Sequence, residues 1–288
     1  MKRILLLLIS LYLLALPMTF AGGGWPQPKG HGYFKLSQWW ILSDRHFTDA
    51  GKIDPNVTSG LYNTSLYGEY GFTDRFTGII YAPFFSRATF NNQVSATTAE
   101  ILRPGGAING IGDWDIGFKY GLRTGKPLVI SATLTVGLPL GNPAGGEQGN
   151  LQTGDGEFNQ LLQIDASHSF RVGKHNAYAT VYAGFNHRTR GFSEEVRGGL
   201  EGGIGFLDGK LYAILRVYGI LSLKNGTSAD PINSTSLFAN NSEHLTISPE
   251  VAYRWNDHWG ISATAARPLT GRIIFAGNAF SIGLFHTW

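Results

Sequence analysis

Apolar and polar residues alternate along most of this 288-residue chain with the period of two that is typical of β-strands. The clearest example is the segment 112–122, in which Trp114 and Ile116 alternate with Asp113 and Asp115. Successive side chains of a strand point to opposite faces of a sheet, so one face of this strand is apolar and the other is charged. Because the same pattern recurs in further segments up to the carboxyl terminus, it predicts an all-β fold.

The segments between the predicted strands alternate strictly in length. Short polar turns lie at residues 73–75, 123–126, 171–174, 207–210 and 256–258. Longer irregular segments lie at residues 43–59, 87–110, 141–157, 188–194, 224–243 and 267–275. Outer-membrane barrels join antiparallel strands by short periplasmic turns and long extracellular loops. We therefore expect a transmembrane antiparallel up-and-down β-barrel of about twelve strands over residues 31–288, located in the outer membrane.

The composition favours a membrane barrel over a soluble sandwich, whose strands would also alternate. The chain has 39 Gly and 15% charged residues, against about 25% charged in an average soluble domain. It has no cysteine, which excludes disulfides and thiol chemistry. Aromatic residues at predicted strand ends fit the girdles that such barrels place at the two membrane surfaces. The candidates are Trp40, Phe72, Trp255, Trp259 and Trp288.

The amino terminus carries the pattern of a secretory signal peptide. Two basic residues precede an apolar run over residues 4–16, and Thr19 and Ala21 supply the small residues of a cleavage site. Cleavage after Ala21 would leave a short segment that hangs in the periplasm or folds into the barrel mouth as a partial plug. We expect three parts: a signal peptide over residues 1–21, this segment over residues 22–30, and the barrel over residues 31–288.

The last predicted strand presents one apolar face and ends on an aromatic residue. That face consists of Phe280, Ile282, Leu284, His286 and Trp288. It resembles the carboxyl-terminal signal that the barrel-assembly machinery recognises, with His286 at a position where an aromatic residue is commoner. We therefore expect this machinery as a partner, together with outer-membrane lipid and lipopolysaccharide; a pI of about 9.0 is compatible with contact to anionic lipopolysaccharide.

Several motifs resemble those of a family of bacterial outer-membrane transporters assigned to the MetA pathway of phenol degradation. Residues 110–122, GIGDWDIGFKYGL, resemble a strand motif of that family, and residues 69–75 resemble its tight turn between early strands. Residues 138–141 resemble the end of its fifth strand, and residues 24–36 resemble the opening of the related XagA-like group. The resemblance implies a channel for passive uptake or release of small solutes, with aromatic or hydrophobic compounds as candidates.

The polar faces of the predicted strands would line the barrel interior. The candidate lumen-lining residues are Lys35, Glu69, Asp113, Asp115, Lys119, Asp165, Tyr178, Tyr182, Arg197, Glu201, Tyr212, Arg216, Tyr218, Glu250 and Arg254. Two interpretations stay open at this point. Either these groups line a narrow path that selects a solute, or they form a salt-bridged interior that fills a barrel of modest width.

The sequence offers little support for other function classes. The eight histidines are scattered without metal-ligand spacing, so we expect no metal and no cofactor. A barrel hydrolase would need a Ser/His pair on one strand face, whereas His168 and Ser169 are adjacent and point to opposite faces. We therefore expect no enzyme, and the lack of a basic run argues against nucleic acid. The main alternative to a channel is a plugged structural barrel whose extracellular loops bind a surface partner or polysaccharide; an outer-membrane hydrolase ranks below it.

Overall fold

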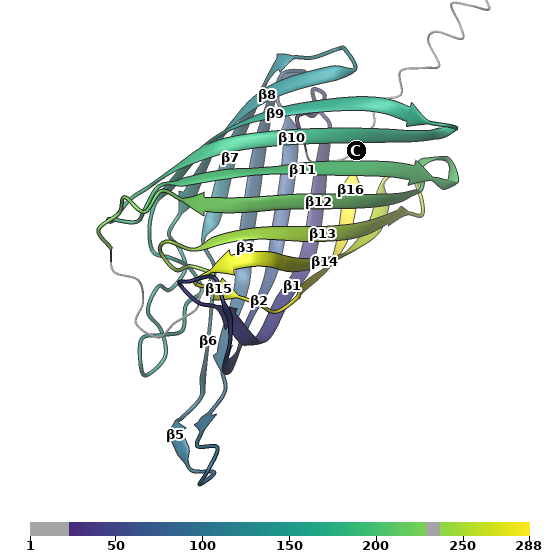
Figure 1. Ribbon diagram of the computed structural model, residues 1–288. Coiled ribbons are helices and arrows are strands. Elements are labelled where there is room, and N and C mark those ends of the chain that lie inside the picture. Colours follow the sequence, from purple (N-terminus) through teal and green to yellow (C-terminus); the bar gives the residue numbers. More distant parts are fainter. Residues whose placement is uncertain (1–22, 229–236) are drawn as a thin grey trace, which may run out of the picture.

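The computed structural model describes residues 23–228 and 237–288, so the predicted signal peptide lies outside the described residues (Figure 1). The chain forms a closed antiparallel barrel of twelve strands. These are β1 (Gly32–Phe47), β2 (Ile53–Gly71), β3 (Phe76–Phe90), β7 (Trp114–Arg123), β8 (Leu128–Leu138), β9 (Asn159–Val172), β10 (His175–Arg188), β11 (Glu195–Phe206), β12 (Leu211–Ser222), β13 (Glu243–Arg254), β14 (Trp259–Arg272) and β16 (Ala279–Thr287). Across residues 23–228 and 237–288, no helix has the length and apolarity needed to span a membrane.

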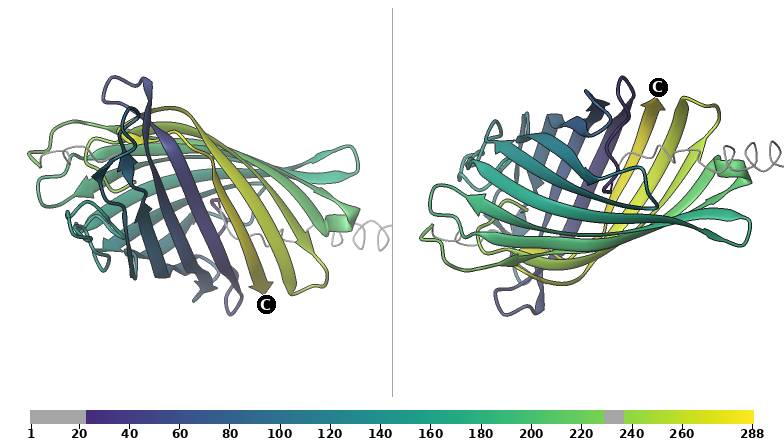
Figure 2. Two further views of the ribbon diagram at one scale, coloured as in Figure 1. Left: turned by 90° about the horizontal axis from the view of Figure 1, so that it is seen from below. Right: turned by 90° about the horizontal axis from the view of Figure 1, so that it is seen from above.

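Closure of the barrel depends on β1, which pairs with β2 on one side and with β16 on the other. The β1–β16 ladder runs from Tyr33, opposite Thr287, to Ile41, opposite Ala279. Figure 2 shows the tilted strands of the closed barrel from two opposite sides. The all-β fold and the strand number predicted from the sequence are confirmed.

The turns at the end of the barrel where β1 begins and β16 ends are short, and glycine makes two of them possible. Gly125 joins β7 to β8 with a φ of +69°, and Gly173 joins β9 to β10 with a φ of +59°. A side chain is strained in this left-handed region, which glycine enters freely. The turn from β11 to β12, η1 (Leu207–Gly209), is left-handed, with φ of +50° at Leu207, +54° at Asp208 and +82° at Gly209. These tight turns hold neighbouring strands in register at the periplasmic end.

Burial in this barrel is inverted relative to that in a soluble protein. Among the fully buried side chains, most are polar, including Thr77, Ser86, Ser131, Ser167 and Asn186. Large apolar side chains lie on the outside instead: Leu200 is 59% exposed and Val251 is 53% exposed. An apolar outer surface around a polar interior is stable only when hydrocarbon surrounds the barrel.

Three of the predicted long loops contain strand, which corrects the sequence-based boundaries. The predicted loop at 43–59 shrinks to a turn at 48–52, because β1 and β2 continue as a hairpin. Likewise β14 continues to Arg272, and a short β15 (Ile274–Phe275) pairs with β1. Asp44 and Arg45 show why alternation missed this extension. Their side chains are 72% and 62% exposed, and two successive charged residues here break the alternation although the strand continues.

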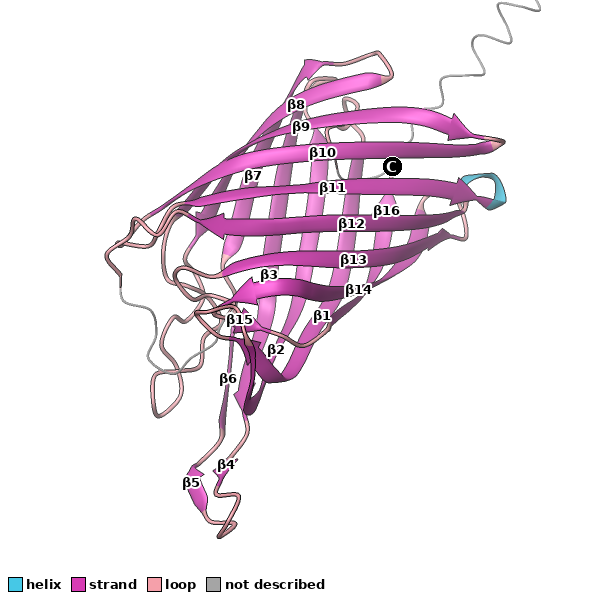
Figure 3. Cartoon of the chain, viewed as in Figure 1, coloured by secondary structure: helices cyan, strands magenta, loops and turns pink. Residues whose placement is uncertain are grey.

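The predicted loop at 87–110 also contains ordered strand. It holds β4 (Gln93–Val94), β5 (Ile101–Arg103) and β6 (Gly106–Gly110), of which β6 pairs with the end of β3. The small β4–β5 hairpin projects away from the barrel (Figure 3). Val94, Ile101 and Leu102 are exposed on it.

Glycines on the inner face of β11 make room for tyrosine rings. A Cβ atom added at Gly203 would lie 2.2 Å from Cε1 of Tyr178. The Tyr178 hydroxyl donates a hydrogen bond to Glu201 over 2.6 Å, so the position of this ring determines a polar contact of the lumen. The glycine therefore serves packing inside the barrel.

We expect Gly203→Ala to lower the free energy of unfolding by about 1–3 kcal/mol, because the new methyl group overpacks against the Tyr178 ring. The measurement is urea unfolding of the refolded barrel followed by tryptophan fluorescence. Gly202→Ala is the matched control, since its Cβ would find no atom closer than 3.8 Å. Equal stability of the two variants would contradict the packing role.

Candidate functional site

The middle of the lumen holds a charged cluster centred on Arg216, which projects inward from β12. Its Nε donates to Glu201 Oε2 over 2.5 Å, and its Nη1 donates to Glu250. Lys35 Nζ lies 3.4 Å from Glu250 Oε1 and adds a fourth strand, β1, to the cluster. Both cations therefore share Glu250, and the cluster ties β1 to β11, β12 and β13 from inside.

A second cluster lies around Glu69, whose side chain has no exposed area. Tyr67 donates a hydrogen bond to this carboxylate, and Gln27 Nε2 donates another over 2.9 Å. Lys119 Nζ lies 3.9 Å from Glu69 Oε1. Nearby Asp165 is buried and accepts a hydrogen bond from Gln163 over 2.9 Å. This cluster connects the barrel wall to the segment that precedes β1.

Residues 23–30 lie against the inner wall. Gly24 N donates to Ser167 Oγ on β9 over 2.7 Å, and Gln27 N donates to Thr77 Oγ1 on β3 over 2.8 Å. Lys119 Nζ donates to the Gly23 carbonyl over 2.8 Å. The Trp25 ring meets Tyr178 on β10 edge to face, with centroids 5.7 Å apart. The segment therefore contacts several strands, in the half of the barrel next to the short turns.

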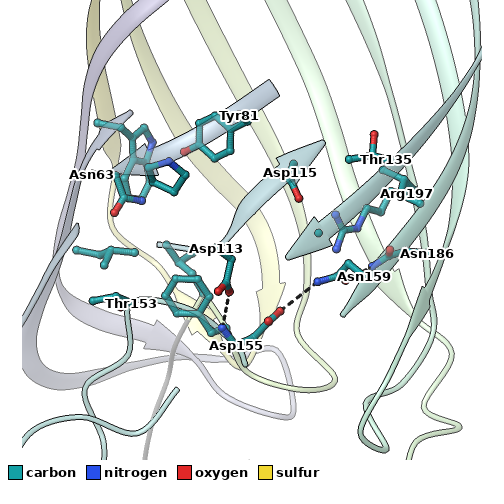
Figure 4. A pocket seen from close by; sticks show the side chains of 17 residues that line it. Asn63, Tyr81, Asp113, Asp115, Thr135, Thr153, Asp155, Asn159, Asn186 and Arg197 are labelled. Carbon is teal, nitrogen blue, oxygen red and sulfur yellow. Dashed lines mark hydrogen bonds between the residues drawn. The ribbon is translucent and has the colours of Figure 1, made fainter. Parts of the chain in front are cut away.

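The other half of the lumen contains a cavity of about 360 Å³ (Figure 4). Asp113, Asp115 and Asp155 lie between Tyr81 on one side and Arg197 on the other. Strands β1, β2, β3, β7, β8, β9, β10 and β11 all contribute lining residues, and so do the loop 139–158 and the residues Leu237 and Phe238. The cavity is thus bordered by eight strands of the barrel wall and by described loop residues at its extracellular mouth.

Arg188 organises the rim of this cavity. Its Nε, Nη1 and Nη2 donate to Glu157 over 2.6 Å, to Glu195 over 2.8 Å and to Asp155 over 3.2 Å. All three nitrogens of the guanidinium therefore face a carboxylate. Burial is the main influence on the pKa of Glu157, in the loop after β8, and raises it, while Arg188 opposes the rise. Arg188 thus anchors the loop 139–158 to β10 and β11.

The structure brings the predicted lumen residues into three groups. Lys35, Tyr178, Glu201, Arg216 and Glu250 form the central cluster, and Glu69, Lys119 and Asp165 lie in the second cluster. Asp113, Asp115 and Arg197 line the cavity. Outside these groups lie Tyr182 and Tyr218, beside Gly199 on β11, Tyr212, beside Gly205, and Arg254, at the periplasmic end of β13. Their part in solute passage stays a prediction.

The predicted carboxyl-terminal signal lies on the outer face of β16. Phe280, Ile282 and Leu284 are exposed there, and Trp288 follows at the end. His286 stacks on the Trp288 ring at a centroid distance of 5.6 Å and meets Trp259 of β14 at 4.5 Å. The His286 imidazole therefore belongs to a band of aromatic side chains at this rim. Recognition of this strand by the assembly machinery stays a prediction.

Sequence reasoning missed the carboxylates and the arginine at the rim. Arg188 falls in the predicted loop 188–194, and Glu195, the first residue of the next predicted strand, is not among the candidate lumen residues, although the alternation of each strand places both side chains inside. On β10, Arg188 continues the inward series of Tyr178 and Tyr182, and on β11 Glu195 precedes inward Arg197 by two residues. Asp155 and Glu157 follow no such rule, because they lie in irregular chain.

Comparisons with known proteins agree with a membrane barrel. A scan against models of protein families finds no match, and a search of curated proteins finds none either. Among solved structures, the chain is similar to the COG4313 outer membrane channel from Pseudomonas putida F1, with 15% identity and a TM-score of 0.62 over 94% of this chain and 100% of that one. It is also similar to the beta domain of the Bordetella autotransporter BrkA, with 11% identity and a TM-score of 0.50 over 90% and 100%.

Fold, burial and these neighbours together define the class of protein. The chain is an integral outer-membrane β-barrel. At these identities the neighbours establish the fold alone, and membership of the phenol-degradation family or its XagA-like group is not confirmed.

Proposed function

We propose that this barrel is a channel for passive movement of small solutes across the outer membrane, with residues 22–30 acting as a partial plug. The observation that carries the proposal is the cavity of about 360 Å³ inside the lumen, lined by both polar and aromatic side chains. A barrel that served only as a scaffold would have no need of a lined cavity, and packed side chains could fill its interior instead.

The contacts of residues 23–30 support the plug. They are single hydrogen bonds and one ring contact, that of Trp25 with Tyr178, and the segment joins the sheet only through an isolated bridge between Lys29 and Gly71. Such a segment can leave the wall without unfolding a strand. The mixture of Trp39, Tyr81 and Phe238 with charged groups in the cavity supports aromatic or hydrophobic solutes, the class that the sequence resemblance implies.

Single-channel conductance of the refolded mature protein in planar bilayers tests this function. We expect the deletion of residues 23–28 to raise conductance at least about twofold. Inward side chains already narrow the lumen of a twelve-stranded barrel, so this segment occupies a large share of the passage that remains. The matched control deletes residues 95–100, an equal length of the projecting β4–β5 hairpin, and should conduct like the parent. Added phenol should reduce the current more than added sucrose does. Absence of conductance from the parent and from the 23–28 deletion would contradict the channel.

One observation favours the alternative of a barrel that binds a surface partner. The β4–β5 hairpin projects from the extracellular end and exposes Val94, Ile101 and Leu102. Exposed apolar side chains on a projecting hairpin fit contact with another molecule. If neither the parent nor the 23–28 deletion conducts, this second function becomes the better account of the fold.

A further inference from the structure

The cavity in the extracellular half of the lumen presents acceptors and negative charge to whatever enters it. We propose that it binds a small organic cation, in which an ammonium or amidinium group is attached to an aromatic or apolar body. This inference names a solute class for the channel proposed above, and its biological meaning rests on that function. The binding itself rests on the lining residues.

The size of the cavity suits a small molecule. Its volume of about 360 Å³ falls at the lower end of the range of about 300–1,000 Å³ that is usual for ligand pockets. Leu61, Leu161 and Leu237 form apolar parts of the wall, while polar side chains enter at a few points. Such a lining favours a compact solute with one polar end.

The charges that line the cavity are predominantly negative. They belong to three aspartates and one arginine, Arg197. Both Nε and Nη2 of Arg197 donate to the same oxygen of Glu195, over 2.9 Å and 2.7 Å. Its guanidinium is therefore shared between Glu195, which it hydrogen-bonds, and Asp115, which it attracts without a hydrogen bond, so one cation faces more than one carboxylate.

One of these aspartates is free to meet a ligand. Asp113 accepts hydrogen bonds from the backbone N–H groups of Gly141, over 2.8 Å, and of Asp155, over 2.7 Å, so it holds the loop in place. Asp155 in turn accepts from Arg188. Within residues 23–228 and 237–288, no protein donor lies within hydrogen-bond distance of the Asp115 carboxylate. A carboxylate in this condition is best satisfied by a charged N–H donor.

Two amide oxygens in the lining also lack donors. Asn186 has no exposed area, and its Nδ2 donates to Asn159 Oδ1 over 2.8 Å and to Glu195 Oε2 over 3.2 Å. These two acceptors determine the orientation of the amide, because the reversed amide would place oxygen against oxygen. Among the described residues, neither Asn186 Oδ1 nor Asn63 Oδ1 receives a hydrogen bond. Both oxygens are shielded from solvent, so they add unpaired acceptor dipoles to the cavity wall and favour a positively charged occupant over a negatively charged one.

The aromatic lining completes the match to an organic cation. Trp39, Tyr81 and Phe238 border the same cavity as Asp115. An aromatic face attracts a cation as well as an apolar ring, and the effect grows when water is excluded. The charged end of an anion would gain nothing from these ring faces and would be repelled by the aspartates. The lining therefore selects by charge as well as by shape.

Calorimetric titration of the full mature protein, refolded in detergent, tests the inference with three matched probes. They are phenethylamine, which is cationic, 2-phenylethanol, which is neutral, and 3-phenylpropionate, which is anionic. We expect phenethylamine to bind at least about tenfold more tightly than the alcohol, since a charge-assisted hydrogen bond is about twice as strong as a neutral one. The anion should bind more weakly than either.

Asp115→Asn should reduce phenethylamine affinity at least about tenfold and leave the alcohol unaffected. Asp208→Asn is the matched control, because Asp208 lies in η1 at the periplasmic rim, outside the cavity. A second variant, Thr135→Lys, places an ammonium group of the protein in the cavity and should abolish the preference for the amine. Circular dichroism verifies that each variant is folded.

Equal affinity of the parent for amine and alcohol would overturn the inference, and so would a folded Asp115→Asn protein that keeps the preference. The channel is judged separately by conductance. If the protein prefers phenethylamine but conducts nothing, the binding site is supported and the proposed channel function is contradicted. If the protein conducts but does not prefer phenethylamine over the alcohol, the channel function is supported and the binding site is contradicted.

Discussion

Arg188→Met should lower the free energy of unfolding of the barrel by about 3–5 kcal/mol, because removing one partner of a buried ion pair leaves the other charge uncompensated. The Arg188 side chain is 4% exposed, and those of Glu157 and Glu195 are 0% and 3% exposed. Methionine fills a similar volume but donates nothing, so these carboxylates and Asp155 would lose their shared cation. The guanidinium also lies 4.4 Å from the Phe192 ring centroid, a contact that methionine replaces only in part.

Urea unfolding of the refolded protein in lipid vesicles measures this loss. Arg171→Met is the control, since Arg171 is exposed near the periplasmic end of β9 and should change stability by no more than about 0.5 kcal/mol. Arg188→Lys should fall between the two, because an ammonium group keeps the charge but lacks the planar fork. A loss in Arg188→Met no larger than that of the control would show that the rim cluster contributes nothing net to stability.

Gly71→Ala should release the amino-terminal segment while leaving every lumen charge in place. The added Cβ would lie 2.1 Å from the carbonyl oxygen of Pro28, a contact that backbone cannot accept. Two hydrogen bonds hold this part of the segment: Gly30 N to the Gly71 carbonyl over 2.8 Å, and Lys29 N to Asp74 Oδ1 over 3.0 Å. At about 1 kcal/mol each, their loss raises the released fraction about 30-fold.

Trypsin cleavage after Lys29 reports this release directly, since the peptide bond must leave the wall to enter the protease. The initial cleavage rate of the refolded barrel should rise about 30-fold in Gly71→Ala, in proportion to the released fraction. Gly202→Ala, an alanine substitution on a strand with open space around it, should be cleaved like the parent. An unchanged rate in Gly71→Ala would mean that the segment is not held at β2.

The sequence was sufficient to predict the strand number because lipid imposes a strict requirement on every membrane-spanning strand. Residues such as Phe118 and Leu200 must be apolar while their neighbours may be polar, so the period of two is visible without any alignment. The requirement ends where the strands leave the hydrocarbon. Beyond that point β1 and β2 keep their ladder but lose the pattern, which is why the hairpin at 43–59 was predicted as a loop.

The sequence predicts which side chains face the lumen, but it does not predict which of them contact one another. The alternation of side chains along each strand places Glu201, Arg216 and Glu250 inside, and all three lie in one cluster. Which of them meet depends on the stagger between strands, and hydropathy does not encode that stagger. Irregular segments carry even less information. Phe238 packs on Ile41 and its neighbours inside the mouth, although nothing in its loop has a periodic pattern.

The contacts of residues 23–30 also have a mechanical consequence. Gly71 and Thr77 belong to β2 and β3, whereas Ser167 and Tyr178 belong to β9 and β10, three to five strands farther around the ring of twelve. The segment therefore works as a brace inside the barrel, because it connects β2 and β3 with β9 and β10 across the lumen. A barrel whose cross-section is held by such a brace resists flattening under lateral pressure from the bilayer. Detaching the brace would both widen the passage and soften the wall, so permeability and stiffness of this barrel should change together.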